Sequence, residues 1–221
     1  MKRLIAVVML IALAVPAESQ IRRRVPRAVE PSVWVSGGIG LFNANGVNDG
    51  DTESTWDFGE SSNAQYRLAV EKAFRNTASI GVTGTYVRVP FTYRGPSAPG
   101  SCGQCAAHLD AVSLGASFHV GGGIGLHQVL EGSAGVIQYR NLTQDSDGSR
   151  LAPENGNIDP YFTFGYGFGY AFGRTMQVSV VQDFGLALHE RRGLTSEQSN
   201  TLRQRTIRLN FRYGMGSRAR N

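Results

Sequence analysis

The stretch that decides the fold is Pro160–Gly173, which reads PYFTFGYGFGYAFG. Within it every second residue is large and aromatic, and the residues between are threonine, glycine or alanine. Side chains on a β-strand point alternately to opposite faces. The stretch therefore predicts a strand with one nearly bare face and one aromatic face, made of Phe162, Phe164, Tyr166, Phe168, Tyr170 and Phe172.

A strand of this kind suits a barrel in lipid better than a soluble sheet. In a soluble sheet the aromatic face would be buried, and the bare face would meet water. In a lipid-embedded barrel the large apolar side chains face lipid, and small or polar side chains face a narrow lumen. The alternation also continues for about ten to twelve residues, which is the length that a tilted strand needs to cross a bilayer. We therefore predict a lipid-facing aromatic stripe.

Composition narrows the class further. The chain has 221 residues, of which 41% are hydrophobic and 18% charged, whereas soluble globular chains have about 25% charged residues. After residue 20 no apolar run approaches the roughly 18 residues of a spanning helix, so a membrane location requires a closed barrel. The net charge of +5 is small and scattered, and gives no support for a nucleic-acid partner.

The first residues resemble an export signal. Met1–Arg3 is basic, Leu4–Val15 is apolar, and Ala17 and Ser19 fit a small-x-small cleavage site. We expect residues 1–19 to be a signal peptide that is cleaved after Ser19. Gln20–Pro31 is a basic lead-in, which we interpret as a solvated linker on the periplasmic side. The alternative is an electrostatic contact with anionic lipid heads or a periplasmic partner.

Seven further stretches alternate between apolar and small or polar residues. One of them, 64–74, could instead be a short helix, because Ser62 and Gln65 would form a capping box. We prefer a strand there because its neighbours require one. The predicted strands around Pro160–Gly173 are Ser32–Phe42, Ala64–Phe74, Ser79–Tyr93, Ala107–Val120, Ile124–Tyr139, Met176–His189 and Thr201–Tyr213.

The connections between these eight strands are alternately long and short. The long ones, 43–63, 94–106, 140–159 and 190–200, are interpreted as polar loops. Outer-membrane barrels have short periplasmic turns and longer outside loops. The sequence thus predicts an all-β fold, an eight-stranded antiparallel up-and-down transmembrane β-barrel over residues 32–213, followed by a short basic tail over 214–221. Side chains can fill the lumen of an eight-stranded barrel.

Several charged residues fall on the faces opposite the apolar stripes. Isolated charges in a narrow lumen are costly, whereas paired charges are tolerated. We therefore predict a lumen charge network in which the arginines meet the carboxylates, formed by Glu71, Glu131, Asp183, Arg208 and Arg212. We interpret it as a set of packing ion pairs without a transport role.

Three segments carry a family resemblance: the signal MKRLIAVVMLIALAVPAES, the strand YFTFGYGFGYAF and the closing strand TIRLNFRY. With them, Ser32–Tyr213 resembles the small eight-stranded outer-membrane barrels of Gram-negative bacteria, the OmpA-like and OmpX-like porin-family group. The resemblance implies an outer-membrane location and contact with outer-membrane lipids, lipopolysaccharide and the barrel-assembly machinery. Such proteins often end on an aromatic residue, but here Phe211 and Tyr213 are followed by Gly214–Asn221.

Two loop motifs contain residues that could form a disulfide or bind a metal. Cys102 and Cys105 form a CxxC, and in an oxidising compartment we expect a small loop disulfide. Free thiols or a metal or redox site are the alternatives, but zinc needs about four ligands and only His108 is near. The acidic run Asn48–Glu53 lacks the spacing of an EF-hand loop, and we expect it to be solvated. We predict neither a metal nor a cofactor.

An enzyme would need a nucleophile, a base and an orienting carboxylate. Some eight-stranded outer-membrane barrels are lipid A deacylases or acyltransferases, and neighbouring predicted strands here carry Ser117, His119, His127 and Glu131. Their spacing fixes no mutual geometry, so we expect no catalytic residues. The expected function is envelope structure or surface interaction through the outside loops, with at most a narrow pore. A secreted, soluble, lipocalin-like binding barrel with its apolar stripes pointing inward is a further alternative.

Overall fold

The computed structural model describes residues 30–59, 62–75, 77–96, 102–152 and 158–217. The predicted signal peptide, most of the basic lead-in and the end of the basic tail lie outside these residues. Within them the chain forms ten β-strands: β1 (Val33–Ala44), β2 (Val47–Asp49), β3 (Ser54–Asp57), β4 (Asn63–Arg75), β5 (Ala78–Arg94), β6 (Gln104–Val120), β7 (Gly125–Gln144), β8 (Ile158–Ala171), β9 (Met176–Leu188) and β10 (Thr201–Met215).

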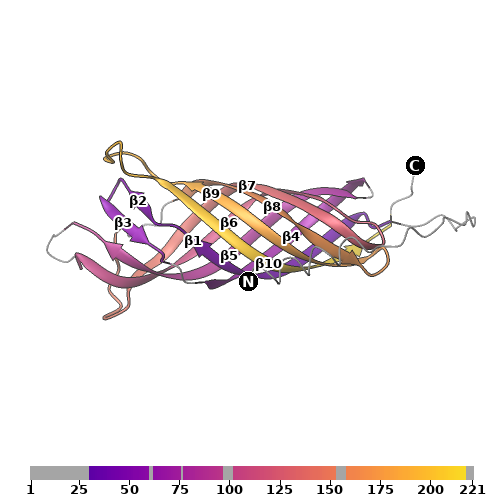
Figure 1. The fold of residues 1–221 in the computed structure, drawn as a ribbon, viewed down its shortest axis with the longest axis horizontal. Coiled ribbons are helices and arrows are strands. Elements are labelled where there is room, and N and C mark those ends of the chain that lie inside the picture. Colours follow the sequence, from indigo (N-terminus) through magenta and orange to yellow (C-terminus); the bar gives the residue numbers. More distant parts are fainter. Residues whose placement is uncertain (1–29, 60–61, 76, 97–101, 153–157, 218–221) are drawn as a thin grey trace, which may run out of the picture.

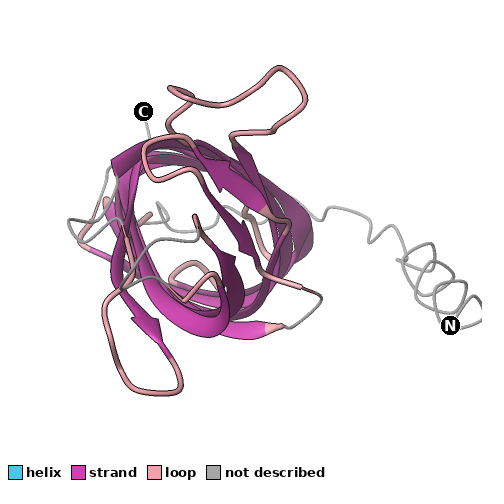
Figure 2. Ribbon diagram, turned by 90° about the vertical axis from the view of Figure 1, so that its left-hand side faces the viewer, coloured by secondary structure: helices cyan, strands magenta, loops and turns pink. Residues whose placement is uncertain are grey.

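Eight of these strands close into a ring. Every neighbouring pair is antiparallel, in the order β4, β1, β10, β9, β8, β7, β6, β5, and β5 returns to β4. Figure 2 shows the ring from one end, and Figure 1 shows its tilted strands from the side. The predicted all-β, eight-stranded antiparallel barrel is confirmed, and the ambiguous segment 64–74 lies in a strand, β4.

The two ends of the barrel differ. Short connections join β4 to β5, β6 to β7 and β8 to β9 at the end that we call the turn end. The long connections lie at the opposite end, the loop end, which is on the left in Figure 1. Among the described residues there is no helix long and apolar enough to span a membrane.

The prediction of a loop over residues 43–63 was wrong in part. This segment contains the β2–β3 hairpin, and β3 continues the sheet by pairing Trp56 with Tyr93 of β5. The hairpin forms because Val47 and Trp56 are apolar and both become fully buried at the loop end. The strands β5, β6 and β7 also extend further toward the loop end than predicted.

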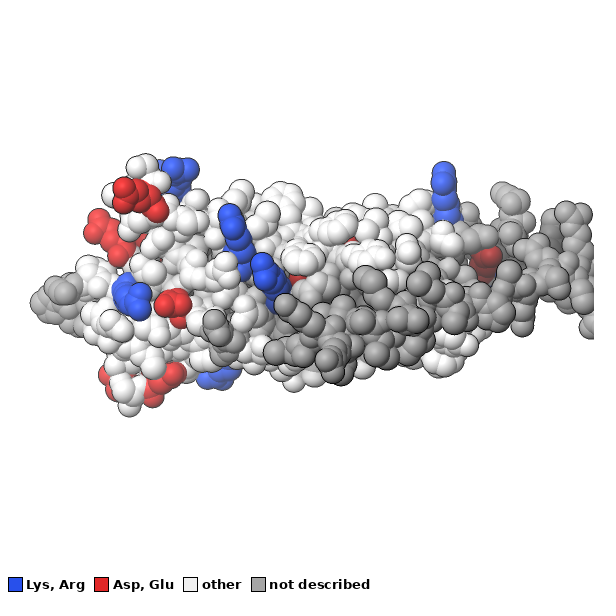
Figure 3. Space-filling view, in the orientation of Figure 1, with Lys and Arg blue, Asp and Glu red and all other residues white. Residues whose placement is uncertain are grey.

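The outer wall is apolar. The six aromatic side chains of the predicted stripe, five in β8 and Phe172 directly after it, alternate outward and are 42% to 57% exposed. From Phe162 to Phe172 they cover roughly 28 Å along the barrel axis, estimated from the rise of a tilted strand. The apolar band of an outer-membrane barrel is about 25 Å tall. In Figure 3 charged side chains concentrate at the loop end, while much of the wall is white.

The bare face of β8 points into the barrel, where neighbouring backbones approach closely. A Cβ on Gly167 would lie 2.0 Å from the carbonyl oxygen of Val180 in β9, so no larger residue fits there without a shift. The soluble, lipocalin-like alternative required the apolar stripes to point inward. The structure places them outward.

Candidate functional site

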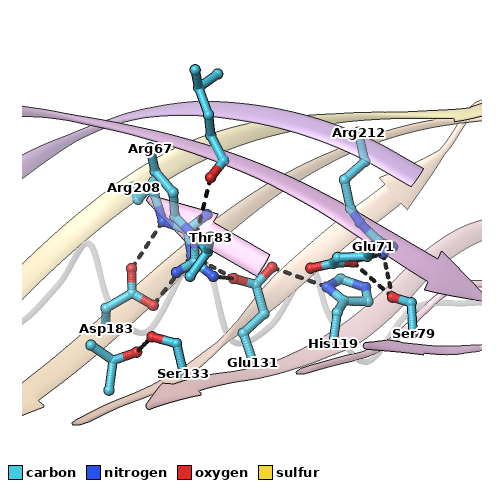
Figure 4. A network of polar contacts seen from close by, with 12 residues as sticks. Arg67, Glu71, Ser79, Thr83, His119, Glu131, Ser133, Asp183, Arg208 and Arg212 are labelled. Carbon is cyan, nitrogen blue, oxygen red and sulfur yellow. Dashed lines mark hydrogen bonds and ion pairs between the residues drawn. The ribbon is translucent and has the colours of Figure 1, made fainter. Parts of the chain in front are cut away.

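Two side-chain clusters fill the barrel lumen. The first, here called the charge cluster, lies toward the turn end and contains Arg67, Glu71, Ser79, His119, Glu131, Asp183, Arg208 and Arg212 (Figure 4). All of these side chains are buried. The second, here called the apolar core, lies toward the loop end and surrounds Trp56.

Arg208 is the centre of the charge cluster. Its Nε donates to Asp183 Oδ2 at 2.9 Å, and its Nη2 donates to Glu131 Oε2 at 2.6 Å and Asp183 Oδ1 at 3.2 Å. Arg67 Nη2 lies 3.5 Å from the same Glu131 oxygen. Arg208 is only 1% exposed, so these pairs are removed from water and depend on one another.

Arg212 forms the second part, nearer the turn end. It donates to the Glu71 carboxylate and, at 2.6 Å, to Ser79 Oγ, while Ser79 Oγ donates to Glu71 at 2.7 Å. Its Nη1 donates to Gln177 Oε1 at 3.2 Å. The guanidinium Cζ also lies 4.6 Å from the centre of the Trp34 ring, a cation–π distance.

The cluster places three guanidinium groups beside three carboxylates. Pairing of this kind is the condition under which buried charges are tolerated. It includes all five residues of the predicted lumen network: Glu71, Glu131, Asp183, Arg208 and Arg212. Arg67 was not predicted to belong to the network. The sequence pattern could have included it, because Arg67 shares the small-residue face of β4 with Glu71.

The candidate catalytic residues do not form a nucleophile–base pair. His119 Nδ1 lies 3.0 Å from Glu131 Oε1, and its Nε2 lies 3.2 Å from the carbonyl oxygen of Gly121. Neither nitrogen is left for Ser117, whose Oγ has no hydrogen-bond partner among the described residues. His127 Nδ1 contacts the carbonyl oxygen of Gly125 at 3.0 Å. His119 therefore belongs to the charge cluster.

The apolar core closes the lumen at the loop end. The Trp56 ring lies 6.0 Å from Phe91, 5.4 Å from Tyr139 and 4.8 Å from His189, measured between centroids. Inward side chains of the extended strands pack around these rings, among them Val87, Val89, Tyr93, Leu109, Ile137 and Leu142. This core was not predicted. The feature of the sequence that could have predicted it is the run after Tyr86, where the alternating apolar residues of β5 change from the outer to the inner face.

A buried polar contact ties three separate segments together within this core. His189 Nδ1 lies 2.6 Å from Asp159 Oδ2, and His189 Nε2 lies 3.3 Å from Asp49 Oδ1. We call these three residues the His189 latch. The side chains of His189 and Asp49 are 0% exposed. The latch joins the β2–β3 hairpin to the start of β8 and the end of β9.

The contacts within the latch favour the charged forms of His189 and Asp49. Burial alone would lower the pKa of His189, but hydrogen bonds and attraction from Asp159 and Asp49 raise it to about 9. Burial would raise the pKa of Asp49, but hydrogen bonds from His189 and Thr52 hold that pKa below its usual value. The expectation that the acidic run Asn48–Glu53 is solvated was therefore wrong for Asp49, which is buried by the apolar core.

The remaining predicted motif lies at the loop end. A disulfide of 2.10 Å joins Cys102 and Cys105, and both residues pack against the apolar core. Among the described residues no group of His, Cys, Asp and Glu could hold a metal ion.

Little free space remains in the described lumen. A cavity of about 10 Å³ lies beside Arg67, Tyr161 and Asp183, which is about the space of one water molecule. At the turn end a mouth of about 270 Å³ is lined by residues that include Trp34 and Gln177. Because both of these side chains contact Arg212, the charge cluster lies directly beyond that mouth.

No protein-family model matches the chain, and no curated protein does. Among solved structures, Neisserial surface protein A is 12% identical with a TM-score of 0.51, and the match covers 83% of this chain and 97% of that one. Weaker matches include OprG from Pseudomonas aeruginosa (10% identity, TM-score 0.45, 86% and 99% coverage) and the protease OmpT from Escherichia coli (11%, 0.43, 85% and 98%). At these identities the likeness concerns the fold. The chain has the fold of the eight-stranded outer-membrane β-barrels, as its sequence pattern predicted.

Proposed function

We propose that this protein is a non-enzymatic, closed barrel of the bacterial outer membrane that acts in envelope structure or surface interaction. The apolar wall contacts lipid, the loop end projects outside the cell, and the turn end faces the periplasm. The signal peptide over residues 1–19 would direct export and then be cleaved, and insertion would use the barrel-assembly machinery. Outer-membrane lipids, including lipopolysaccharide, surround the wall.

The observation that carries this proposal is the double closure of the lumen. An ion passing through would have to separate the Arg208 and Arg212 ion pairs and then cross the apolar core around Trp56. Breaking a buried ion pair costs several kcal/mol, and the apolar side chains around Trp56 offer no ligands to an ion. The closed barrel is therefore better suited to display its loop end at the cell surface than to conduct ions.

A non-enzymatic role is supported by the fact that two histidines, His119 and His189, are buried and already hydrogen-bonded. General acid–base catalysis requires a side chain within hydrogen-bond reach of the substrate. His119 is engaged on both nitrogens, and the His189 latch is sealed from solvent. Neither histidine can reach a substrate while these contacts hold.

The loop end provides a rigid surface instead. Outside the core, Arg88 contacts His108 at 2.6 Å, and His108 contacts Asp145 at 2.6 Å. Asp110 accepts hydrogen bonds from Tyr86 at 3.0 Å and Asn141 at 2.7 Å. These contacts fix polar side chains across the outward faces of β5, β6 and β7. A surface that is ordered before binding loses less entropy when a partner docks.

Conductance tests this proposal. The purified protein, folded in a planar bilayer, is expected to give no current steps above those of the protein-free bilayer. The control is an Arg212→Ser variant, which removes a buried charge beside the turn-end mouth but leaves the apolar core closed, so it should also stay silent. Regular current steps from the wild type would contradict the closed-barrel proposal.

A further inference from the structure

The outer wall carries a groove where β8, β9 and β10 approach the loop end. Its volume is about 400 Å³, within the usual range of about 300–1,000 Å³ for ligand sites. Apolar side chains of β8 and β9 line one side of it, and cationic side chains of β10 line the other. The residues that define it are Phe162, Phe164, Phe184, Leu186, Arg203 and Arg205. We call it the wall groove.

The sheet register places the cations directly beside the apolar surface. Arg203 lies beside Leu186, and Arg205 lies beside Phe184, across the β9–β10 pairing. The next outward residue of β10 toward the turn end is the apolar Ile207. Along β10 the wall therefore changes from apolar to cationic within one outward step, and the rows of Arg203 and Arg205 continue through β9 to Phe162 and Phe164 of β8.

The two arginines differ from other arginines on the outer wall. Arg88 contacts His108, and Arg140 donates to Gln138. Arg203 and Arg205 are exposed, and their side chains form no hydrogen bond or ion pair with another described residue. Two adjacent guanidinium groups repel each other, and an anion placed between them would relieve that repulsion.

We propose that the wall groove binds the phosphorylated glycolipid of the outer leaflet, the lipid A part of lipopolysaccharide. This inference rests on the proposed function, which sets the loop end at the outer leaflet. A guanidinium group forms paired hydrogen bonds with phosphate oxygens, so Arg203 and Arg205 would hold the phosphate. The phenylalanine rings beside them would pack against an acyl chain. One ligand thus accounts for both the charge and the apolar part of the groove.

Lipid retention tests this site. The full chain is folded into nanodiscs that contain phosphatidylcholine with a small fraction of lipid A, then repurified in mild detergent, and the retained lipid A is quantified by mass spectrometry. The variant R203Q/R205Q should retain about tenfold less lipid A than wild type, because two charge-assisted hydrogen-bond sites are lost. The control R191Q/R192Q removes the same charge from an exposed loop and should retain the wild-type amount.

The outcomes separate the two proposals. Equal retention by R203Q/R205Q and R191Q/R192Q would overturn the groove as a lipid A site while leaving the barrel proposal standing. Equal retention of lipid A and its dephosphorylated form by wild type would overturn phosphate recognition. If wild type fails to insert into any bilayer, the outer-membrane proposal itself fails. Selective loss in R203Q/R205Q, with normal insertion, supports both.

Discussion

Among single residues, Arg208 is expected to contribute most to the stability of the charge cluster. It pairs with Glu131 and Asp183 at once, and no water-exposed group can replace it because the site is buried. The Arg208→Met variant should lose about 3–5 kcal/mol of unfolding free energy, because it leaves the Asp183 carboxylate buried without its partner and removes one partner of Glu131. Urea unfolding in lipid vesicles, followed by gel mobility, measures this loss. Equal urea midpoints for wild type and Arg208→Met would contradict the account, and exposed Arg191→Gln serves as the control.

His189 predicts a dependence on pH. Its pKa of about 9 lies above the ordinary value of 6.5, so the stability that the latch contributes is complete below pH 6.5 and is lost as the pH rises through 9. The contribution is on the order of 3 kcal/mol. The Asp49 carboxylate, whose pKa is lowered, loses its own contribution only in acid. The urea midpoint of wild type should therefore exceed that of His189→Asn at pH 7, and the difference should shrink by pH 10. A constant difference would show that the latch does not depend on a protonated histidine.

At the scale of elements, the β2–β3 hairpin is attached to a ring that closes without it. Trp56 anchors the hairpin, and Trp56→Ala should remove about 3–5 kcal/mol of local stability through the cavity that it leaves. Limited proteolysis of vesicles should then cleave the hairpin while the ring of β1 and β4 to β10 stays protected. Trp56→Phe keeps an aromatic anchor and should resist cleavage for longer. Simultaneous digestion of hairpin and ring in Trp56→Ala would contradict their independence.

The elements also show what a sequence can predict. β8 was predicted because its period of two is unbroken and glycine fills the opposite face. The five predicted charges could be assigned to the lumen face because each alternates with the residues of an apolar stripe and so points to the opposite side of its strand. The β2–β3 hairpin was missed because its strands are short and lie within a polar segment. The His189 latch could not be predicted, since Asp49, Asp159 and His189 are distant in the chain and meet only after the ring has closed.

At the scale of the whole molecule, the barrel is arranged in reverse of a soluble protein. Large apolar side chains cover the outside, and ion pairs occupy the part of the lumen nearer the turn end. In water the outer wall would expose apolar area far beyond the patches that soluble monomers tolerate. In lipid the same wall is solvated, and the closed ring satisfies every hydrogen bond between neighbouring strands.

We propose that the apolar wall contacts the lipid of the outer membrane. The first measurement is the gel mobility of the protein in an isolated outer-membrane fraction, with and without boiling in detergent. We expect the protein in this fraction, with a different mobility before and after boiling, because a closed barrel resists the detergent until it is heated. A protein found only in the soluble periplasm or the medium, with one mobility before and after heating, would contradict the claim.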